Sequence, residues 1–518
     1  MRLSWTKRYA YASDAERRQS RLNELWRLVC GMDTQYIRQL NDPQLLDHLE
    51  QLDELMRHYL TAGDMPKLKE VMIRYQALLE ACHARGIGGV EMAYFEMLFL
   101  WINGTLYRKH SQGRKAAEYY GKCIRCAEQC VGLLKEAQQL SSEQKLFVGW
   151  NCAECCKEAA ELYDELLEPE RCMSVLQQLV SLLQWLLRFT QANQSICESA
   201  AEMYVFAANI FYQNGEVSLG SRCYQNAALL LKELAIYRKD SHFGARAIWV
   251  QSVHGIMSLM KEGKADVLGQ CEQQAAAFLA RETAASEMDL AMVDAALANV
   301  LLQKSALFQR NGKVGESLQL TRDCGARLEK ALGILQAVRA SDRGGQYRFL
   351  TDVTARIYNS YIGAMSSMGV ILYQNDAFGE AKGYLTKTLA LMNDKSGAYP
   401  TGSLAALLRA EVHQYLGLIA SDEGEYDEAV FYLTQAADMA LSFGNGREDA
   451  NALAIGAISC SVLSGLMLQM RNKADAGVYA DKGLNACDRL ERIAAGHPTL
   501  AVRQTLLHQK KKASRRFF

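Results

Sequence analysis

The sequence predicts an all-α protein built as a stack of helical hairpins, and three observations lead to this fold class. Apolar residues recur at helical spacing from about residue 13 to 508, and no run of alternating β-branched residues interrupts them. Proline, which stops a helix, occurs only 5 times in 518 residues. The breaks between the periodic segments are short and polar, so successive helices are expected to lie antiparallel.

Three or four helices are expected before residue 90, roughly over 13–30, 43–61 and 66–84. They show no copy of the repeated pattern found later, and we expect them to cap the N-terminal end of the stack, since an end repeat must present a polar outer face. The last helix, about 497–514, is expected to cap the other end. The breaks between helices are predicted near Pro66, near Pro169, and at 238–244, 341–345, 395–402 and 444–449.

A repeated arrangement of small and large residues is clearest between 360 and 440. A hairpin needs small residues where its two helices cross and large residues to fill the gaps between them. The segment 415–440 carries Leu416 and Gly417 in its first helix, Gly424 and Tyr426 at its turn, and Ala429, Leu433 and Ala436 in its second helix. The segment 368–392 repeats the arrangement with Gly369, Phe378, Ala381, Leu385 and Thr388. Weaker copies are predicted at 104–123, 208–227, 305–324 and 464–483.

This arrangement resembles the tetratricopeptide repeat (TPR) family, whose pattern is Leu-Gly, then Gly-x-Tyr, then Ala, an apolar residue and Ala. The resemblance touches residues from about 100 to 485 and implies a right-handed α-solenoid of about nine or ten hairpins, with the first helices lining a concave face. Ala381, Ala429 and Ala476 lie 48 and 47 residues apart, whereas the common TPR repeat has about 34. The sequence therefore resembles a long-helix variant of the family.

Three regions are expected from these patterns: an N-terminal helical cap at 1–90, a TPR-like α-solenoid at 91–495, and a C-terminal capping helix with a basic tail at 496–518. The tail from Arg503 onward carries six basic residues and no acidic one. Such a run can contact phosphates or an acidic partner, but a solvated helix end is the simpler interpretation.

The charge balance argues against some classes of partner. Lys and Arg together number 58, as do Asp and Glu, so no overall field attracts nucleic acid, which is an unlikely partner. We expect no membrane-spanning segment, because the apolar runs at 97–102 and 179–187 are too short. Fifteen cysteines, an odd number, suit a reducing compartment, and a cytoplasmic location is expected.

Six cysteines cluster in two neighbouring helical segments: Cys123, Cys126 and Cys130, then Cys152, Cys155 and Cys156. A fold of the chain about residue 140 would place the two groups at one level. Thiolates on one helix face can hold zinc, copper(I) or an iron–sulfur cluster. Buried thiols that pack as small core residues are the favoured interpretation, and no cofactor is predicted.

No catalytic motif is found: the chain contains no phosphate loop, no HExxH, no GxSxG and no dinucleotide glycine fingerprint. The nine histidines are scattered, and His413 lies at a large-residue position of the clearest repeat, which favours packing over catalysis. The sequence therefore does not predict an enzyme.

The expected binding groove lies on the first helix of each hairpin. The element Tyr-Gln-Asn occurs at 212–214 and 373–375 in the same repeat frame. Amides beside aromatic rings suit the main chain of a bound peptide, although Gln and Asn are also ordinary near solvated helix ends. The residues predicted to line the groove are Trp101, Arg108, Lys109, Asn209, Tyr212, Gln213, Tyr373, Gln374 and Gln414.

The leading functional hypothesis is a non-enzymatic scaffold that binds a protein or peptide on the concave face. An alternative is a peptide-sensing regulator in which a change of curvature releases a partner, as the resemblance to long-helix TPR regulators implies. A third hypothesis is a thiol-bound metal protein using the cysteine cluster. The sequence specifies neither the ligand nor the oligomeric state.

Overall fold

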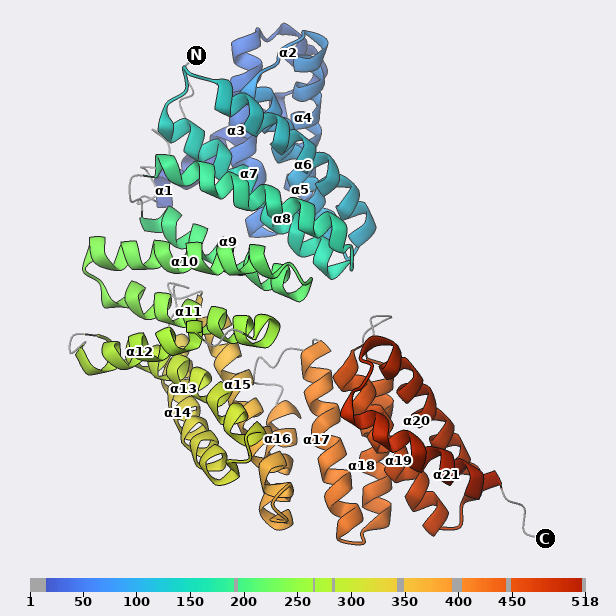
Figure 1. Ribbon diagram of the computed structural model, residues 1–518. Helices are drawn as coiled ribbons and strands as arrows, with labels where there is room; N and C mark the ends of the chain where they lie inside the picture. The colour runs from blue at the N-terminus through green and yellow to red at the C-terminus, as the bar shows by residue number, and fades with distance from the viewer. Residues whose placement is uncertain are drawn as a thin grey trace. The chain divides into compact units, whose positions relative to one another are not determined.

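The chain is helical throughout the part that its computed structural model describes, which comprises residues 15–190, 194–263, 266–281, 285–341, 349–393, 403–443 and 449–514. These residues contain 21 α-helices and no β-strand. Consecutive helices run side by side as antiparallel pairs (Figure 1). The all-α fold of stacked TPR-like helical hairpins is therefore confirmed.

The structure divides into two compact units, Met1–Lys239 and Asp240–Phe518. The sequence did not predict this division, which falls inside the region expected to form one solenoid. The boundary follows α10, where Lys239 adopts a left-handed backbone conformation with φ 53°.

The first unit contains ten α-helices arranged largely as hairpins. The helices expected near the N-terminus are present as α1, α3 and α4, and α2 is an additional short helix. The bounds are α1 (Ala15–Gly31), α2 (Thr34–Gln39), α3 (Asp42–Ala62), α4 (Met65–Ala84), α5 (Val90–Lys109), α6 (Gly113–Glu136), α7 (Ser142–Glu165), α8 (Pro169–Leu186), α9 (Gln194–Gln213) and α10 (Val217–Arg238).

The helix starts in this unit follow from local capping chemistry. Asn41 with Gln44 and Ser141 with Gln144 form reciprocal capping boxes at α3 and α7. Pro43, Pro66 and Pro169 lie in the first turns of α3, α4 and α8, where a missing N–H removes no helical hydrogen bond. Two of these prolines therefore mark the starts of helices at the breaks that the sequence predicted.

The described residues of the second unit form five hairpins and one further helix, α21, which contacts α19 and α20. Its bounds are α11 (Ser241–Glu262), α12 (Asp266–Arg281), α13 (Glu287–Arg310), α14 (Val314–Ser341), α15 (Phe349–Tyr373), α16 (Phe378–Asn393), α17 (Ser403–Asp422), α18 (Tyr426–Leu441), α19 (Ala450–Gln469), α20 (Lys473–Ile493) and α21 (Val502–Ser514). The predicted breaks at 341–345, 395–402 and 444–449 lie outside the described residues except for Ser341 and Asp449.

The predicted crossing residues meet within their hairpins. A Cβ atom added to Gly369 would lie 2.6 Å from Leu385, and one added to Gly104 would lie 3.0 Å from Tyr120. In α13 and α14 the same positions carry Ser305 and Thr321, whose hydroxyl oxygens are 2.6 Å apart and buried. Small first-helix residues thus admit the second helix, as the repeated arrangement indicated.

A second regularity appears at the hairpin turns. In each of seven turns, one residue has a left-handed backbone conformation with positive φ. The residue five positions later, in the second helix, is small and buried. Glycine adopts this conformation readily, but four of the seven residues are not glycine. The seven left-handed residues are Ser111, Leu167, Gly215, Gly312, Asp376, Gly424 and Arg471. The buried residues that follow them are Ala116, Cys172, Gly220, Ser317, Ala381, Ala429 and Ala476.

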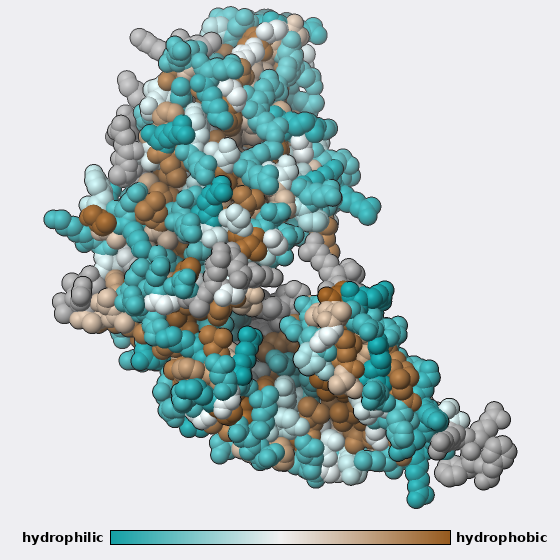
Figure 2. All heavy atoms as spheres, in the orientation of Figure 1, coloured by the Kyte–Doolittle hydropathy of each residue, from teal (hydrophilic) through white to brown (hydrophobic). Residues whose placement is uncertain are grey.

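Within the described part of the chain, two helices, α13 and α19, are long and apolar enough to cross a membrane by length and composition alone. The uncharged stretch of α19 was not among the apolar runs noted in the sequence, because its large apolar residues are interspersed with Ala, Gly and Ser. In the structure, 56% and 72% of the two apolar stretches are buried inside the protein, as expected for core helices. Figure 2 shows hydrophilic residues over most of the face drawn, with hydrophobic residues between them.

Candidate functional site

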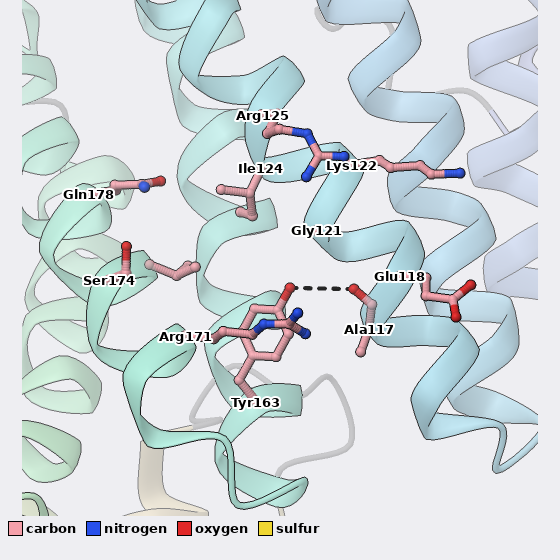
Figure 3. Close-up of a pocket in the computed structure, with 11 residues that line it drawn as sticks. Ala117, Glu118, Gly121, Lys122, Ile124, Arg125, Tyr163, Arg171, Ser174 and Gln178 are labelled. Carbon is pink, nitrogen blue, oxygen red and sulfur yellow. Dashed lines mark hydrogen bonds between the residues drawn. The ribbon is translucent and has the colours of Figure 1, made fainter.

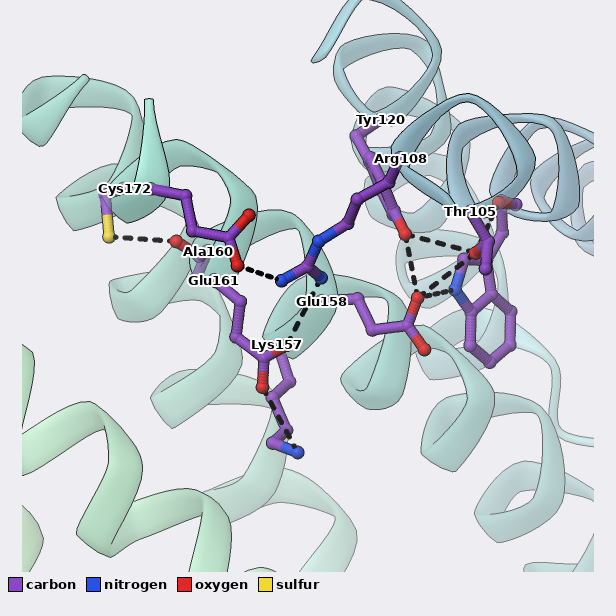
Figure 4. Close-up of polar contacts among 10 residues, drawn as sticks. Thr105, Arg108, Tyr120, Lys157, Glu158, Ala160, Glu161 and Cys172 are labelled. Atoms are coloured by element: carbon purple, nitrogen blue, oxygen red, sulfur yellow. Dashed lines mark hydrogen bonds and ion pairs between the residues drawn. The ribbon is translucent and has the colours of Figure 1, made fainter. Parts of the chain in front are cut away.

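A polar cluster joins α5, α6 and α7 in the first unit (Figure 4). The Trp101 indole nitrogen donates a hydrogen bond to the Glu158 carboxylate at 2.7 Å, and the Tyr120 hydroxyl donates to the same oxygen at 2.8 Å. Thr105 approaches that oxygen at 3.2 Å. Burial and the nearby Glu158 charge raise the pKa of Tyr120, so its hydroxyl remains a donor. Three donors therefore converge on one carboxylate.

Arg108 extends this network along the same helices. Its guanidinium contacts Glu161 at 3.3 Å and Glu165 at 2.5 Å, both on α7. Lys109 is exposed and lies 3.4 Å from the Leu60 carbonyl oxygen. The polar groups of Trp101 and Arg108 are thus already engaged by the next hairpin, which leaves them less capacity for a ligand.

The second group of predicted groove residues lies on α9. Asn209 is half-buried and accepts a hydrogen bond from the Tyr224 hydroxyl, and Gln213 is exposed. Tyr212 is 0% exposed and packs so closely on Gly220 that an added Cβ there would lie 2.5 Å from the ring. The placement of Tyr212 in an open groove was therefore wrong, because this hairpin carries its large residue on the first helix.

The third group lies on α15 and α17 in the second unit. The Tyr373 hydroxyl donates to Asp422 at 3.0 Å, and Gln374 accepts from Gln309 at 2.8 Å at the protein surface. Gln414 is only 5% exposed and donates to the Ile455 carbonyl oxygen at 3.3 Å. Gln414 therefore bridges α17 to α19 inside the core, and its prediction as a groove residue was wrong.

A hollow lies along the first helices α11, α13 and α15 of the second unit, and we call it the first-helix hollow. Its volume is about 300 Å³. Apart from Thr321 on α14, its lining comes entirely from those three helices. The lining residues are Ile256, Asn299, Leu302, Gln303, Ser305, Ala306, Gln309, Thr321, Ser360, Gly363, Ala364, Ser367 and Ile371.

Asn299 distinguishes this hollow from the other surfaces. The residue is 6% exposed, and its Oδ1 atom is buried without a hydrogen-bond partner among the described residues. A buried amide oxygen without a partner costs free energy, about 1–3 kcal/mol for a typical polar group. Across the hollow, a Cβ atom added to Gly363 would meet nothing within 4 Å. The hollow thus combines open space with unused hydrogen-bonding capacity.

A second hollow, of about 450 Å³, lies between α6, α7 and α8 in the first unit. Figure 3 shows the Tyr163 ring at its centre, with its hydroxyl 3.4 Å from the Ala117 carbonyl oxygen. The Arg171 guanidinium lies 5.8 Å from the ring centroid, and Lys122 points away. None of its described lining residues has a buried polar atom without a partner. It offers less evidence of a ligand than the first-helix hollow.

The cysteine cluster forms thiol pairs between α6 and α7. The Sγ atoms of Cys123 and Cys155 are 2.7 Å apart, which confirms that the two groups meet at one level. Burial raises the pKa of both thiols, so they are protonated at neutral pH in the metal-free protein. Cys126 is half-buried, and its pKa is raised to about 11. Among the described residues, no group of three or more His, Cys, Asp or Glu is arranged to hold a metal ion.

The hairpins and the first-helix hollow define an all-α helical-repeat protein with a polar recess on its first helices. No family model matches the chain. No curated protein matches it either.

A comparison with solved structures finds helical proteins that match this chain with low sequence identity. The apo form of RapI has 12% identity and a TM-score of 0.41, with 86% of this chain and 98% of that one covered. The apo quorum sensor NprR from B. thuringiensis has 10% identity and a TM-score of 0.40, with 85% of this chain and 99% of that one covered. PilF from Pseudomonas aeruginosa has 16% identity and a TM-score of 0.32, covering 61% and 99%. Because these TM-scores are low, the fold assignment rests on the chain's own hairpins.

Asn299 and Gly363, the most informative residues of the hollow, were not among the predicted site residues. The predictions followed aromatic residues and the repeated Tyr-Gln-Asn element near the helix ends, whereas the hollow lies further from the turns. The available signal was Gly363 itself, a glycine inside a first helix at a position that no neighbouring helix fills.

Proposed function

We propose that this protein is a non-enzymatic scaffold that binds a protein or peptide along the first helices of its second unit. The observation that carries the proposal is the Asn299 side chain, which is nearly buried at the wall of the first-helix hollow and has an unpaired amide oxygen. A bound partner that supplies an N–H group would satisfy this oxygen after a rotation of the Asn299 amide, because the oxygen itself has almost no exposed surface.

The hydrogen-bonding groups around the hollow support a partner that presents peptide groups. Gln303 and Gln309 lie on the same helix as Asn299, and Ser360 and Ser367 face them from α15. Amides and hydroxyls both donate and accept, and a peptide main chain needs both. In the first unit, Trp101 and Arg108 already bond to α7, so they support a structural role more strongly than a binding role.

Sensing is a second candidate function, and the position of the hollow favours it. The lining comes from the first helices of three successive hairpins, so one ligand would contact all three. A ligand that binds one arrangement of these hairpins more tightly than another shifts the population toward it. Under this proposal, binding alters the curvature of the second unit and thereby the affinity for a partner.

We also propose a cytoplasmic location, because fourteen of the fifteen free cysteines are buried or half-buried thiols without a disulfide framework.

The proposal is tested by affinity capture with two matched pairs of amide substitutions. Gln303→Ala with Gln309→Ala removes two amides of the hollow from the first helix α13, and Gln319→Ala with Gln336→Ala removes two from the exposed side of α14. Both double variants should melt close to the parent. Loss of captured partners in the first-helix variant alone supports the proposal, whereas equal capture by all three proteins contradicts it.

A further inference from the structure

We propose that the first-helix hollow selects an uncharged, extended peptide segment with a small side chain seated over Gly363. This inference rests on the proposed function and adds the chemical class of the ligand at that site. It is carried by the chemistry of the lining, by the unpaired amide of Asn299 and by the open space at Gly363.

The lining of the hollow contains no ionisable side chain, although Asp, Glu, Lys and Arg make up 22% of the whole sequence. Its polar groups are the amides of Asn299, Gln303 and Gln309 and a set of hydroxyls. A charged ligand group entering the hollow would lose water and find no counter-charge in the wall, which is unfavourable. A neutral segment avoids that penalty, so the hollow discriminates against charge.

Asn299 indicates how the segment is held. Its Oδ1 atom is an acceptor without a partner among the described residues, and no side-chain hydrogen bond of the residue is found there. An Asn amide carries an acceptor and two donors on one planar group. The main chain of an extended peptide presents a carbonyl oxygen and an N–H group that match these. Asn299 therefore recognises main-chain groups of the peptide, which are present whatever the peptide sequence.

The size of the ligand side chain follows from the small residues in the lining of the hollow. Gly363, Ala364 and Ala306 are small, and the space beyond Gly363 is open to at least 4 Å. The volume of about 300 Å³ lies at the lower end of the roughly 300–1,000 Å³ usual for ligand pockets. The hollow therefore accepts a short segment and a small side chain, while a large aromatic side chain is excluded.

The experiment uses the full-length chain as immobilised bait for a displayed library of random heptapeptides. Gly363→Leu fills the hollow, and Gly383→Leu is its matched control, because an added Cβ at exposed Gly383 on α16 also meets nothing within 4 Å. We expect parent and Gly383→Leu to enrich the same peptides, depleted in Asp, Glu, Lys and Arg. Binding to Gly363→Leu should weaken at least about tenfold.

The affinity of an enriched peptide provides a second readout. Because no charge pair is involved, its Kd should change less than about twofold between roughly 0.05 and 0.5 M salt. Enrichment of charged peptides, or a strong dependence on salt, would overturn the inference. Neutral peptides that bind Gly363→Leu as well as the parent would also overturn it, while leaving peptide binding elsewhere on the chain intact. Absence of any enriched peptide from the folded parent would refute the proposed function itself.

Discussion

Gly417 lies directly against Leu433, so closely that a Cβ atom added to the glycine would be 2.6 Å from the leucine Cγ. Leu433 is 0% exposed and cannot move aside without displacing its neighbours. The contact fixes the crossing of α17 and α18 and recurs between Gly369 and Leu385 in the preceding hairpin. The two helices of each hairpin can therefore approach this closely only because the crossing residue is glycine, which has no Cβ atom.

Substitution at this crossing should lower stability. We expect Gly417→Ala to reduce the free energy of unfolding by about 1–3 kcal/mol, the usual cost of overpacking. Gly383→Ala is the control: its Cβ enters open space, and replacing a helical glycine should raise stability by up to about 1 kcal/mol. Thermal unfolding of both variants measures the difference. A Gly417→Ala protein as stable as Gly383→Ala would show that the crossing tolerates a methyl group.

The Glu158 carboxylate should be important for the stability of the first unit. Glu158→Ala removes the common acceptor of Trp101, Tyr120 and Thr105, and we expect it to cost about 1.5–3 kcal/mol. Glu165→Ala removes only a partly exposed partner of Arg108 and should cost less than about 1 kcal/mol. Chemical denaturation distinguishes the two. Equal effects of the two substitutions would contradict the role assigned to Glu158.

His413 should make stability depend on pH. Burial, followed by the nearby Arg409 charge, lowers the pKa of His413 from 6.5 to about 4. Between these pH values the unfolded chain binds a proton that the folded chain does not, so stability should fall as pH decreases from 6.5 toward 4. The His413 ring is tilted against Tyr432, with the ring centroids 5.6 Å apart, and replacing it by His413→Phe should remove this component. Half-buried Glu411, whose pKa is raised by burial, remains in both proteins. Parallel curves of melting temperature against pH for the two proteins would refute the assignment.

The thiol pairs should pack without metal. We expect protein purified under reducing conditions without added metal to carry none, and its melting temperature to be insensitive to a chelator, because Cys123 and Cys155 are buried and pack as small core residues between α6 and α7. Elemental analysis and thermal unfolding with and without the chelator provide the measurements. Near-stoichiometric zinc, copper or iron would reverse this interpretation of the cluster.

The sequence predicted the hairpins where the small and large residues follow the family pattern closely. Gly417 and Ala429 were placed correctly because glycine and alanine are distinctive at a crossing. The hairpin of α7 and α8 was not recognised as a copy, because Leu167 occupies the left-handed turn position and Cys172 the small buried one. Cysteine can replace alanine in such a core, so the structural position persists while the sequence signal weakens.

The candidate site was less predictable, because it depends on which face of a helix is left uncovered. Tyr212 and Tyr373 belong to the same Tyr-Gln-Asn element, yet Tyr212 is buried against Gly220 while Tyr373 lies half-buried beside Asp422. Local sequence cannot distinguish these outcomes, since the partner residue lies on another helix. Asn299 likewise carries no distinctive sequence signal, and only its missing hydrogen-bond partner draws attention to it.

The most direct measurement of where a partner binds is site-specific photocrosslinking. A photoreactive amino acid is introduced at Ser367, an exposed lining residue of the first-helix hollow, and in separate variants at Gly383 on α16 and at Lys511 on α21. Each variant is expressed in the native cell, and crosslinked partners are identified by mass spectrometry. Binding on the first helices predicts crosslinks from Ser367 and none from Gly383 or Lys511. Crosslinks from Lys511 alone would place the partner on the basic C-terminal helix and contradict the central claim.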